Sequence, residues 1–186
     1  KTVLSEFDTN RTGVIICITL DEGDELIGVE LTDGEQEIML VTREGQAIRF
    51  SEEEVRSMGR NARGVKGITL DENDWVVGLG VANGYDLLVV TENGYGKRTP
   101  TAEYRRTSRG GKGVKTLNKT EKTGAIADVL MVQESNEVMI ISMEGIMIRL
   151  RASDISVLGR NTQGVTLMRL DDGDKVVAVA NIVGED

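Results

Sequence analysis

The sequence repeats itself with a period of about 50 residues. A Gly-Val pair occurs at residues 13–14, 64–65, 113–114 and 164–165, so that successive pairs lie 51, 49 and 51 residues apart. Self-similarity at such a period is typical of arrays in which each repeat is one small supersecondary unit. The period therefore constrains the fold more than any single motif does.

Two independent markers share this phase. A turn glycine follows an apolar run at Gly45, Gly94 and Gly145, and an acidic hairpin follows Leu20, Leu70 and Leu170. The markers divide one repeat domain, residues 1–186, into the end of one blade (1–34) and three further blades (35–84, 85–135 and 136–186). We call these the first to fourth repeats.

Each full repeat is predicted to contain four strands. The first is an apolar run (38–41, 87–90 and 138–141), of the kind that is covered on both faces of a sheet. A second strand such as 47–50 follows the turn glycine, and the polar segment 51–54 has room for one helical turn. The third strand begins at the Gly-Val pair, and the acidic hairpin leads to the fourth, such as 75–79. We expect an all-β, propeller-like domain, with blades that are either separate or exchange strands with their neighbours.

Composition excludes several kinds of catalytic site. The chain has no histidine and a single cysteine, Cys17, which rules out a His/Cys zinc site and catalytic triads or dyads that use histidine. Cys17 lies in the apolar run 14–18, where a buried, unreactive thiol is expected. We expect no cofactor, no metal and no membrane segment, although weak calcium binding by the acidic hairpins remains an alternative.

The net charge of −9 argues against a nucleic-acid partner, but the charges are segregated. Residues 21–39 contain eight acidic side chains and no basic one, whereas residues 97–119 contain eight basic side chains and one acidic residue, Glu103. A local excess of cations can bind phosphates even on an acidic protein.

Basic residues also recur in phase with the repeat. One position is basic in every repeat (Lys1, Arg49, Arg98 and Arg149), and a second group precedes the Gly-Val pair (Arg11, then Arg60 with Arg63, Arg109 with Lys112, and Arg160). Equivalent positions of an array lie on the same side, so we predict a basic belt that binds and bends double-stranded DNA through its phosphates. The predicted DNA-binding residues are Arg49, Arg60, Arg63, Lys97, Arg98, Arg105, Arg106, Arg109, Gly110, Gly111, Lys112, Gly113, Lys115, Arg149 and Arg160. Only 3% of the residues are aromatic, which disfavours a single-strand binder that stacks bases.

The segment Ser108–Gly113 combines two cations with three glycines. Glycines allow backbone N–H groups to approach an anion, so this segment is predicted to form a phosphate-binding concavity. The alternative is a Gly-rich connection between blades.

Four segments (37–42, 58–65, 88–98 and 158–165) resemble the C-terminal domain of DNA gyrase A. The resemblance implies the last blades of a six-bladed β-pinwheel that exchanges strands and wraps DNA. It also implies partnership with the rest of gyrase A and with gyrase B, in a cytoplasmic bacterial topoisomerase that introduces negative supercoils at the expense of ATP. The family's wrapping motif is matched only partly, by residues 107–113. The catalytic tyrosine of the family belongs to an N-terminal region, so Tyr85, Tyr95 and Tyr104 are not assigned that role and no catalytic residue is expected here. Alternatives are the equivalent domain of topoisomerase IV and a protein-interaction propeller.

Overall fold

The apolar runs form central strands of three antiparallel sheets in the computed structural model, which describes residues 1–10 and 12–182. The first sheet has the order β3-β1-β2-β6 and the second β10-β5-β4-β7, whereas the third contains β11-β8-β9. The strands are β1 (Glu37–Thr42), β2 (Gln46–Ser51), β3 (Val76–Val81), β4 (Asp86–Thr91), β5 (Tyr95–Pro100), β6 (Val114–Lys115), β7 (Ile126–Val132), β8 (Glu137–Ser142), β9 (Met147–Arg151), β10 (Val165–Thr166) and β11 (Val176–Ile182). Four short 3-10 helices accompany them: η1 (Leu4–Phe7), η2 (Glu52–Glu54), η3 (Thr101–Glu103) and η4 (Ala152–Asp154).

Neighbouring repeats exchange strands. The Gly-Val strand β6 belongs to the third repeat, yet it pairs with β2 of the second, with Val114 opposite Ala47. In the same way β10 of the fourth repeat pairs with β5 of the third, with Val165 opposite Gly96. Sequence alone left two kinds of propeller open, and these pairings select the strand-exchanging one.

Apolar clusters join adjacent sheets. In β4, Leu87 and Val89 belong to the cluster shared with β1, while Leu88 and Val90 belong to the cluster shared with β8. The predicted burial of the first strand on both faces is therefore confirmed for β4. The corresponding residues of β8 alternate between buried and half-buried, because β8 lies in the last sheet of the array.

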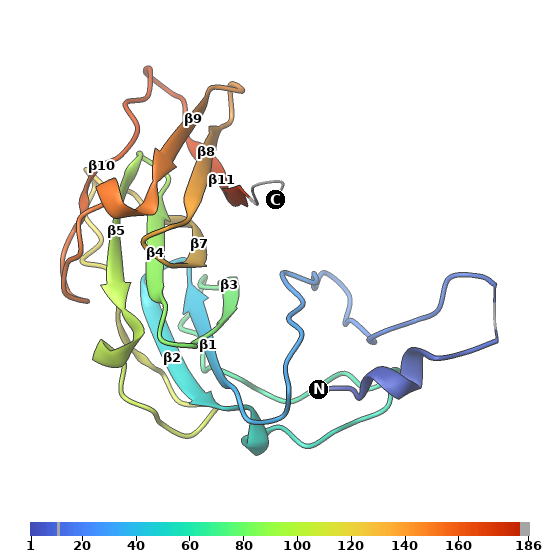
Figure 1. Ribbon diagram of the computed structural model, residues 1–186. Coiled ribbons are helices and arrows are strands. Elements are labelled where there is room, and N and C mark those ends of the chain that lie inside the picture. The colour runs from blue at the N-terminus through green and yellow to red at the C-terminus, as the bar shows by residue number, and fades with distance from the viewer. Residues whose placement is uncertain (11, 183–186) are drawn as a thin grey trace.

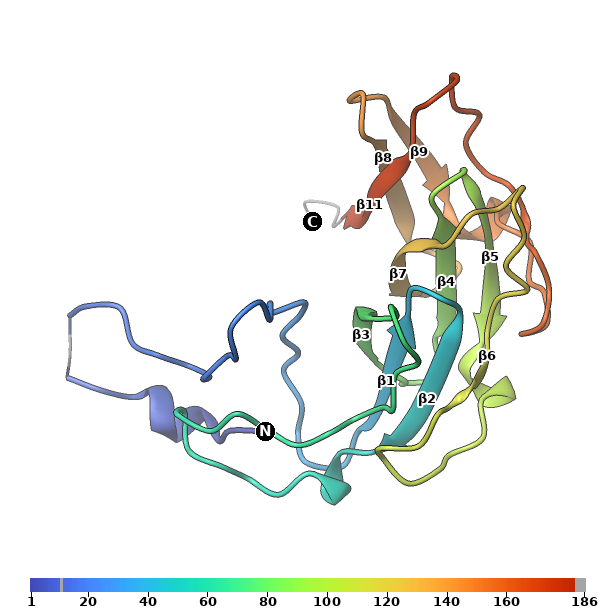
Figure 2. The same ribbon diagram turned by 180° about the vertical axis from the view of Figure 1, so that it is seen from behind.

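The three sheets follow one another along an arc, which both ribbon views show (Figures 1 and 2). Strands β3, β7 and β11 lie on its inner side, where β7 packs between β3 and β11. The exchanged strands β6 (Figure 2) and β10 (Figure 1) form the opposite, outer edges of their sheets. Segments that lead to an exchanged strand are therefore placed on the outside of the curve.

The first repeat differs from the expectation. Between residues 12 and 36 the chain forms no strand, and it extends away from the sheets (Figure 1, blue). Cys17 is exposed, so the prediction of a buried thiol is wrong. The equivalent residues Ile68, Leu117 and Met168 are all buried. Two of them follow an exchanged strand that is paired with the preceding repeat, whereas within residues 12–36 the segment around Cys17 forms no strand. The Gly-Val pair at 64–65 likewise forms no strand.

Candidate nucleic-acid interface

Three equivalent loops carry most of the predicted DNA-binding residues. We call residues 55–66, 104–115 and 155–166 the rim loops. Each runs from a 3-10 helix to a Gly-Val pair, and the loops of the third and fourth repeats end in the outer strands β6 and β10. Each loop lies against the preceding repeat. The N–H of Thr107 donates to the carbonyl of Arg49 over 2.9 Å, and that of Leu158 donates to Arg98 over 2.9 Å. Their order along the chain therefore becomes their order along the outer edge.

The first recurring cation forms an ion pair within its own hairpin. Arg49 pairs with Glu37, Arg98 pairs with Asp86 over 2.8 Å, and Arg149 pairs with Glu137. In each case the acid opens the first strand and the cation lies on the second, diagonally across the hairpin. The recurrence that suggested a basic belt therefore reflects, at these positions, an ion pair inside each hairpin.

Two of these cations also bind the next repeat. Arg49 Nη1 donates to the carbonyl of Thr101 over 2.7 Å, and Arg98 Nε donates to the carbonyl of Ile155 over 3.1 Å. The guanidinium of Arg98 is only 3% exposed, so the structure corrects its assignment to the DNA-binding surface. Such contacts hold each rim loop onto the sheet that precedes it.

Lys97 is fully buried as well, and it is therefore a second correction. Its ammonium donates to the carbonyls of Gly159 and Arg160, over 2.6 and 2.5 Å, and to Thr162 Oγ1 over 3.0 Å. Burial lowers the pKa of Lys97 to about 8. The side chain fixes the rim loop of the fourth repeat and cannot reach a ligand in solvent.

A second recurring cation makes a contact between repeats. Arg60, Arg109 and Arg160 each donate from Nη1 to a main-chain carbonyl of the preceding repeat, over 3.0, 2.9 and 3.2 Å; the acceptors are Ile16, Lys66 and Lys115. These guanidinium groups are half-buried and partly engaged. Arg11, which was grouped with them, lies outside the described residues.

The remaining predicted cations are exposed. Arg63 pairs with Asp21, Lys112 pairs with Asp71 over 3.0 Å, and Arg106 approaches Glu37 at 3.7 Å. In the described part of the chain, Arg105 and Lys115 form no ion pair. All five lie on rim loops, four of them on the loop of the third repeat. This loop carries the strongest exposed concentration of predicted DNA-binding cations.

The Gly-rich segment of that loop has a mixed role. Gly113 has a φ of +76°, and a Cβ there would overlap the carbonyl of Ala47, so strand exchange requires glycine at this position. Gly110 also has a positive φ, and its N–H donates to the carbonyl of Gly67. Across residues 1–10 and 12–182, the amides of Gly111 and Lys112 donate to no protein oxygen. Only part of the predicted concavity is therefore available to an anion.

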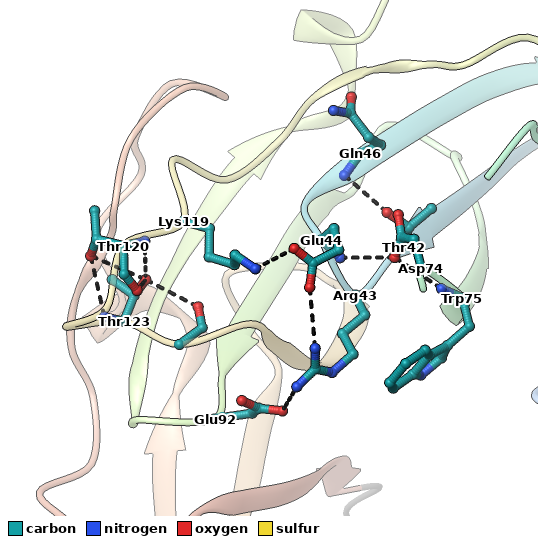
Figure 3. A network of polar contacts seen from close by, with 11 residues as sticks. Thr42, Arg43, Glu44, Gln46, Asp74, Trp75, Glu92, Lys119, Thr120 and Thr123 are labelled. Carbon is teal, nitrogen blue, oxygen red and sulfur yellow. Dashed lines mark hydrogen bonds and ion pairs between the residues drawn. The ribbon is translucent and has the colours of Figure 1, made fainter. Parts of the chain in front are cut away.

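Charged residues at the turns between first and second strands form a separate network (Figure 3). Arg43 pairs with Glu92 of the next repeat over 2.6 Å and lies 4.8 Å from the centre of the Trp75 ring. Glu44 pairs with Lys119. Arg43 thus joins two repeats.

The acidic hairpin contributes to the same turns. Asp74 Oδ1 accepts the N–H of Glu44 over 3.0 Å, and the equivalent Asp174 accepts that of Glu144 over 3.1 Å. A hydrogen bond from Ser142 is the main reason that the pKa of Asp174 lies below its ordinary value. The last acid of the hairpin therefore orders a turn, whereas the first, Asp21 or Asp71, lies exposed beside a rim cation.

Sequence reasoning missed two kinds of residue. Glu37, Asp86 and Glu137 recur in the same phase as the arginines with which they pair, and this signal could have identified the ion pairs. Arg56 and Lys66 are exposed on the first rim loop at the positions equivalent to Arg105 and Lys115. Aligning whole loops rather than single markers would have found them.

No other chemistry emerges from the described residues. They contain no group of three His, Cys, Asp or Glu side chains that could hold a metal ion. Nor does this part of the chain contain a helix long and apolar enough to cross a membrane. Burial raises the pKa of Tyr104 to about 12, and its hydroxyl shares a hydrogen bond with Thr116.

The fold and the rim loops define a propeller-like repeat domain whose sheets exchange strands and whose outer edge carries exposed cations. The family model of the DNA gyrase C-terminal domain, a beta-propeller, matches residues 1–33, 36–83, 85–133 and 136–182, and the chain belongs to this family. It is 47% identical over 183 residues to DNA gyrase A of Escherichia coli strain K12, a match that covers 98% of the chain and 21% of the relative. The chain thus spans about a fifth of the length of such relatives.

Two solved structures resemble this chain closely. A DNA gyrase A C-terminal domain superposes with a TM-score of 0.85 at 29% identity, covering 91% of this chain and 58% of that one. The C-terminal domain of DNA topoisomerase IV superposes with a TM-score of 0.84 at 27% identity, covering 89% of this chain and 52% of the other. Both solved chains therefore share the overall fold of this chain.

Proposed function

We propose that this chain binds double-stranded DNA along its outer edge and bends it, as the DNA-wrapping part of a gyrase A protein. The observation that carries the proposal is the placement of exposed cations on rim loops at the outside of an arc, in a chain of net charge −9. A curved row of cations suits a bent phosphate backbone. Membership of the gyrase C-terminal domain family supports the same function.

Binding would proceed by exchange of ion partners. The pairs Arg63–Asp21 and Lys112–Asp71 are exposed, and such pairs are worth about 1 kcal/mol or less. A phosphate can therefore replace the carboxylate at little cost, while the released counterions favour association. The unengaged amides of Gly111 and Lys112 lie next to the Lys112 side chain in the chain and would supply donors for a phosphate oxygen.

The partners of the domain would be the remainder of gyrase A and the gyrase B protein. In that assembly the chain supplies DNA wrapping, while strand cleavage and ATP hydrolysis belong to other regions. The holoenzyme would then introduce negative supercoils into DNA in the bacterial cytoplasm.

A salt titration of duplex binding tests the proposal. The logarithm of the association constant is expected to fall linearly with the logarithm of salt concentration, by about 0.9 for each phosphate neutralised. Binding that does not weaken with salt would contradict a phosphate-directed interface. Reversal of Lys112, an exposed rim-loop cation, to Glu should weaken binding.

The topoisomerase IV domain is a second candidate, favoured by the TM-score of 0.84. The chain's 47% identity to DNA gyrase A supports the first candidate more strongly. Fusing the chain to a gyrase core that lacks this domain distinguishes them. Recovery of negative supercoiling supports gyrase, whereas relaxation without supercoiling supports topoisomerase IV. A protein-interaction propeller predicts no duplex binding even at low salt.

A further inference from the structure

The three rim loops differ sharply in charge at four equivalent, exposed positions. In the second repeat these positions are Arg56, Ser57, Arg63 and Lys66. In the third repeat they are Arg105, Arg106, Lys112 and Lys115, and in the fourth they are Ser156, Val157, Gln163 and Thr166. At these four positions the loop of the second repeat has three cations, that of the third has four and that of the fourth has none. The chain nevertheless follows the same route in the third and fourth repeats.

The recurring arginines do not replace the cations that the fourth-repeat loop lacks. Arg160 is half-buried and donates to the carbonyl of Lys115, just as Arg60 and Arg109 donate to their own acceptors. Because this arginine is present in all three loops with the same structural contact, it cannot account for a difference between them. Only the four exposed positions differ in charge between the loops.

The fourth-repeat loop is also fixed by a buried lysine of the preceding repeat, whereas the third-repeat loop is not. Lys97 binds two carbonyls and a hydroxyl of residues 159–162, whereas its equivalent in the second repeat is the apolar Ile48. The fourth-repeat loop thus gains a contact with the preceding repeat but no exposed cation.

Where the rim loop lacks the exposed cation before the Gly-Val pair, the preceding repeat also lacks the acidic residue that would pair with it. Asp21 pairs with Arg63, and Asp71 pairs with Lys112. In the next repeat the equivalents are Thr120 and Gln163, which are both uncharged. The exposed ion pair that a phosphate would break is thus present at the rim loops of the second and third repeats and missing from that of the fourth.

From these observations we propose that the duplex contacts the rim loops of the second and third repeats and leaves the protein before the fourth. The four exposed positions, rather than the recurring arginines, decide whether a rim loop holds a phosphate backbone. This inference rests on the proposed function and assigns the path of the DNA within it.

The test measures the salt dependence of binding to a fluorescein-labelled duplex of mixed sequence by anisotropy. Changing Arg105, Arg106, Lys112 and Lys115 to Gln should reduce the magnitude of the slope by about 3 to 4. The matched control removes four exposed cations outside these positions, by changing Lys122, Arg151, Arg169 and Lys175 to Gln. This control should leave the slope almost unchanged.

The converse variant, with Ser156 and Val157 changed to Arg and Gln163 and Thr166 changed to Lys, should extend the contact and increase the slope. Amide hydrogen exchange should slow with DNA in residues 105–115 but not in residues 156–166 of the unaltered chain. Equal losses in the two neutralised variants, no gain in the converse variant, or equal slowing in both loops would overturn the proposed path. Salt-dependent binding by the unaltered chain would still support the proposed function, whereas its absence would refute that function itself.

Discussion

Arg98 and Asp86 form an ion pair within one β-hairpin, with Nη1 2.8 Å from Oδ2 and the guanidinium almost fully buried. The same guanidinium donates to the carbonyl of Ile155 in the next repeat. One side chain therefore closes a hairpin and holds a neighbouring rim loop. Breaking a buried pair leaves an uncompensated charge, which is far more costly than losing an exposed pair.

Replacing Arg98 with Gln should lower the free energy of unfolding by about 3 kcal/mol. The equivalent change at Arg149, whose pair with Glu137 is largely exposed, should cost less than about 1 kcal/mol. Urea denaturation of both variants measures the difference. Equal, small losses would show that burial does not distinguish the two pairs.

Lys97 should make stability depend on alkaline pH. Its pKa is about 8 in the folded chain and 10.5 for an ordinary lysine, so the unfolded state binds more protons between these values and stability rises with pH. The slope contributed by this residue is at most about 1.4 kcal/mol per pH unit.

The variant to compare is Lys97→Ile, because Ile occupies the equivalent positions 48 and 148. Its free energy of unfolding should lack the extra rise between pH 8 and 10. Tyr104, with a pKa of about 12, contributes an opposing loss of stability only above its unfolded pKa of 10. Parallel curves for the two proteins in this window would contradict the assignment.

Gly113 should be far less tolerant of substitution than Gly64, although both have a positive φ. Alanine at either position incurs backbone strain of about 1–2 kcal/mol. At Gly113 the added methyl group also overlaps the carbonyl of Ala47 and opens the pairing of β2 with β6, whereas nothing lies within 4 Å of the same position at Gly64. A larger fall in the denaturation midpoint for Gly113→Ala is expected. Similar midpoints would argue that close approach does not explain this glycine.

Asp71 should weaken DNA binding by competing for Lys112. Asp71→Asn should increase affinity at low salt by several-fold, because one exposed carboxylate no longer competes with phosphate. The control is Glu72→Gln, which removes the same charge from an adjacent exposed residue that forms no ion pair in the described part of the chain. Anisotropy titrations compare the affinities of the two variants for DNA. An equal gain in affinity would show that only the change in net charge matters.

Much of the fold was determined by local sequence. The apolar runs became β1, β4 and β8 because short, continuously apolar segments between turn signals are stable only when buried in a sheet. Ser51 begins the expected short helical turn by accepting the N–H of Glu53 over 3.3 Å. The turn glycines Gly45, Gly94 and Gly145 all have the positive φ that favours glycine at such turns.

Contacts between repeats depended on the tertiary structure. A Gly-Val strand has the same local pattern whether it pairs within its own repeat or with the preceding one, so only the pairing of β6 with β2 could reveal the exchange. Cys17 shows the same limit, because burial of an apolar run depends on the partner that covers it.

By itself the sequence determined the period, the all-β strand pattern and the presence of cations in phase with the repeat. Only the tertiary structure decided which of those cations face solvent. Arg98 and Lys112 are both basic and both recur in the same array, yet the first is 3% exposed and the second 74%. The physical reason is that a charge is buried only where oxygen atoms from distant segments surround it. Asp86 and the carbonyl of Ile155 do so for Arg98.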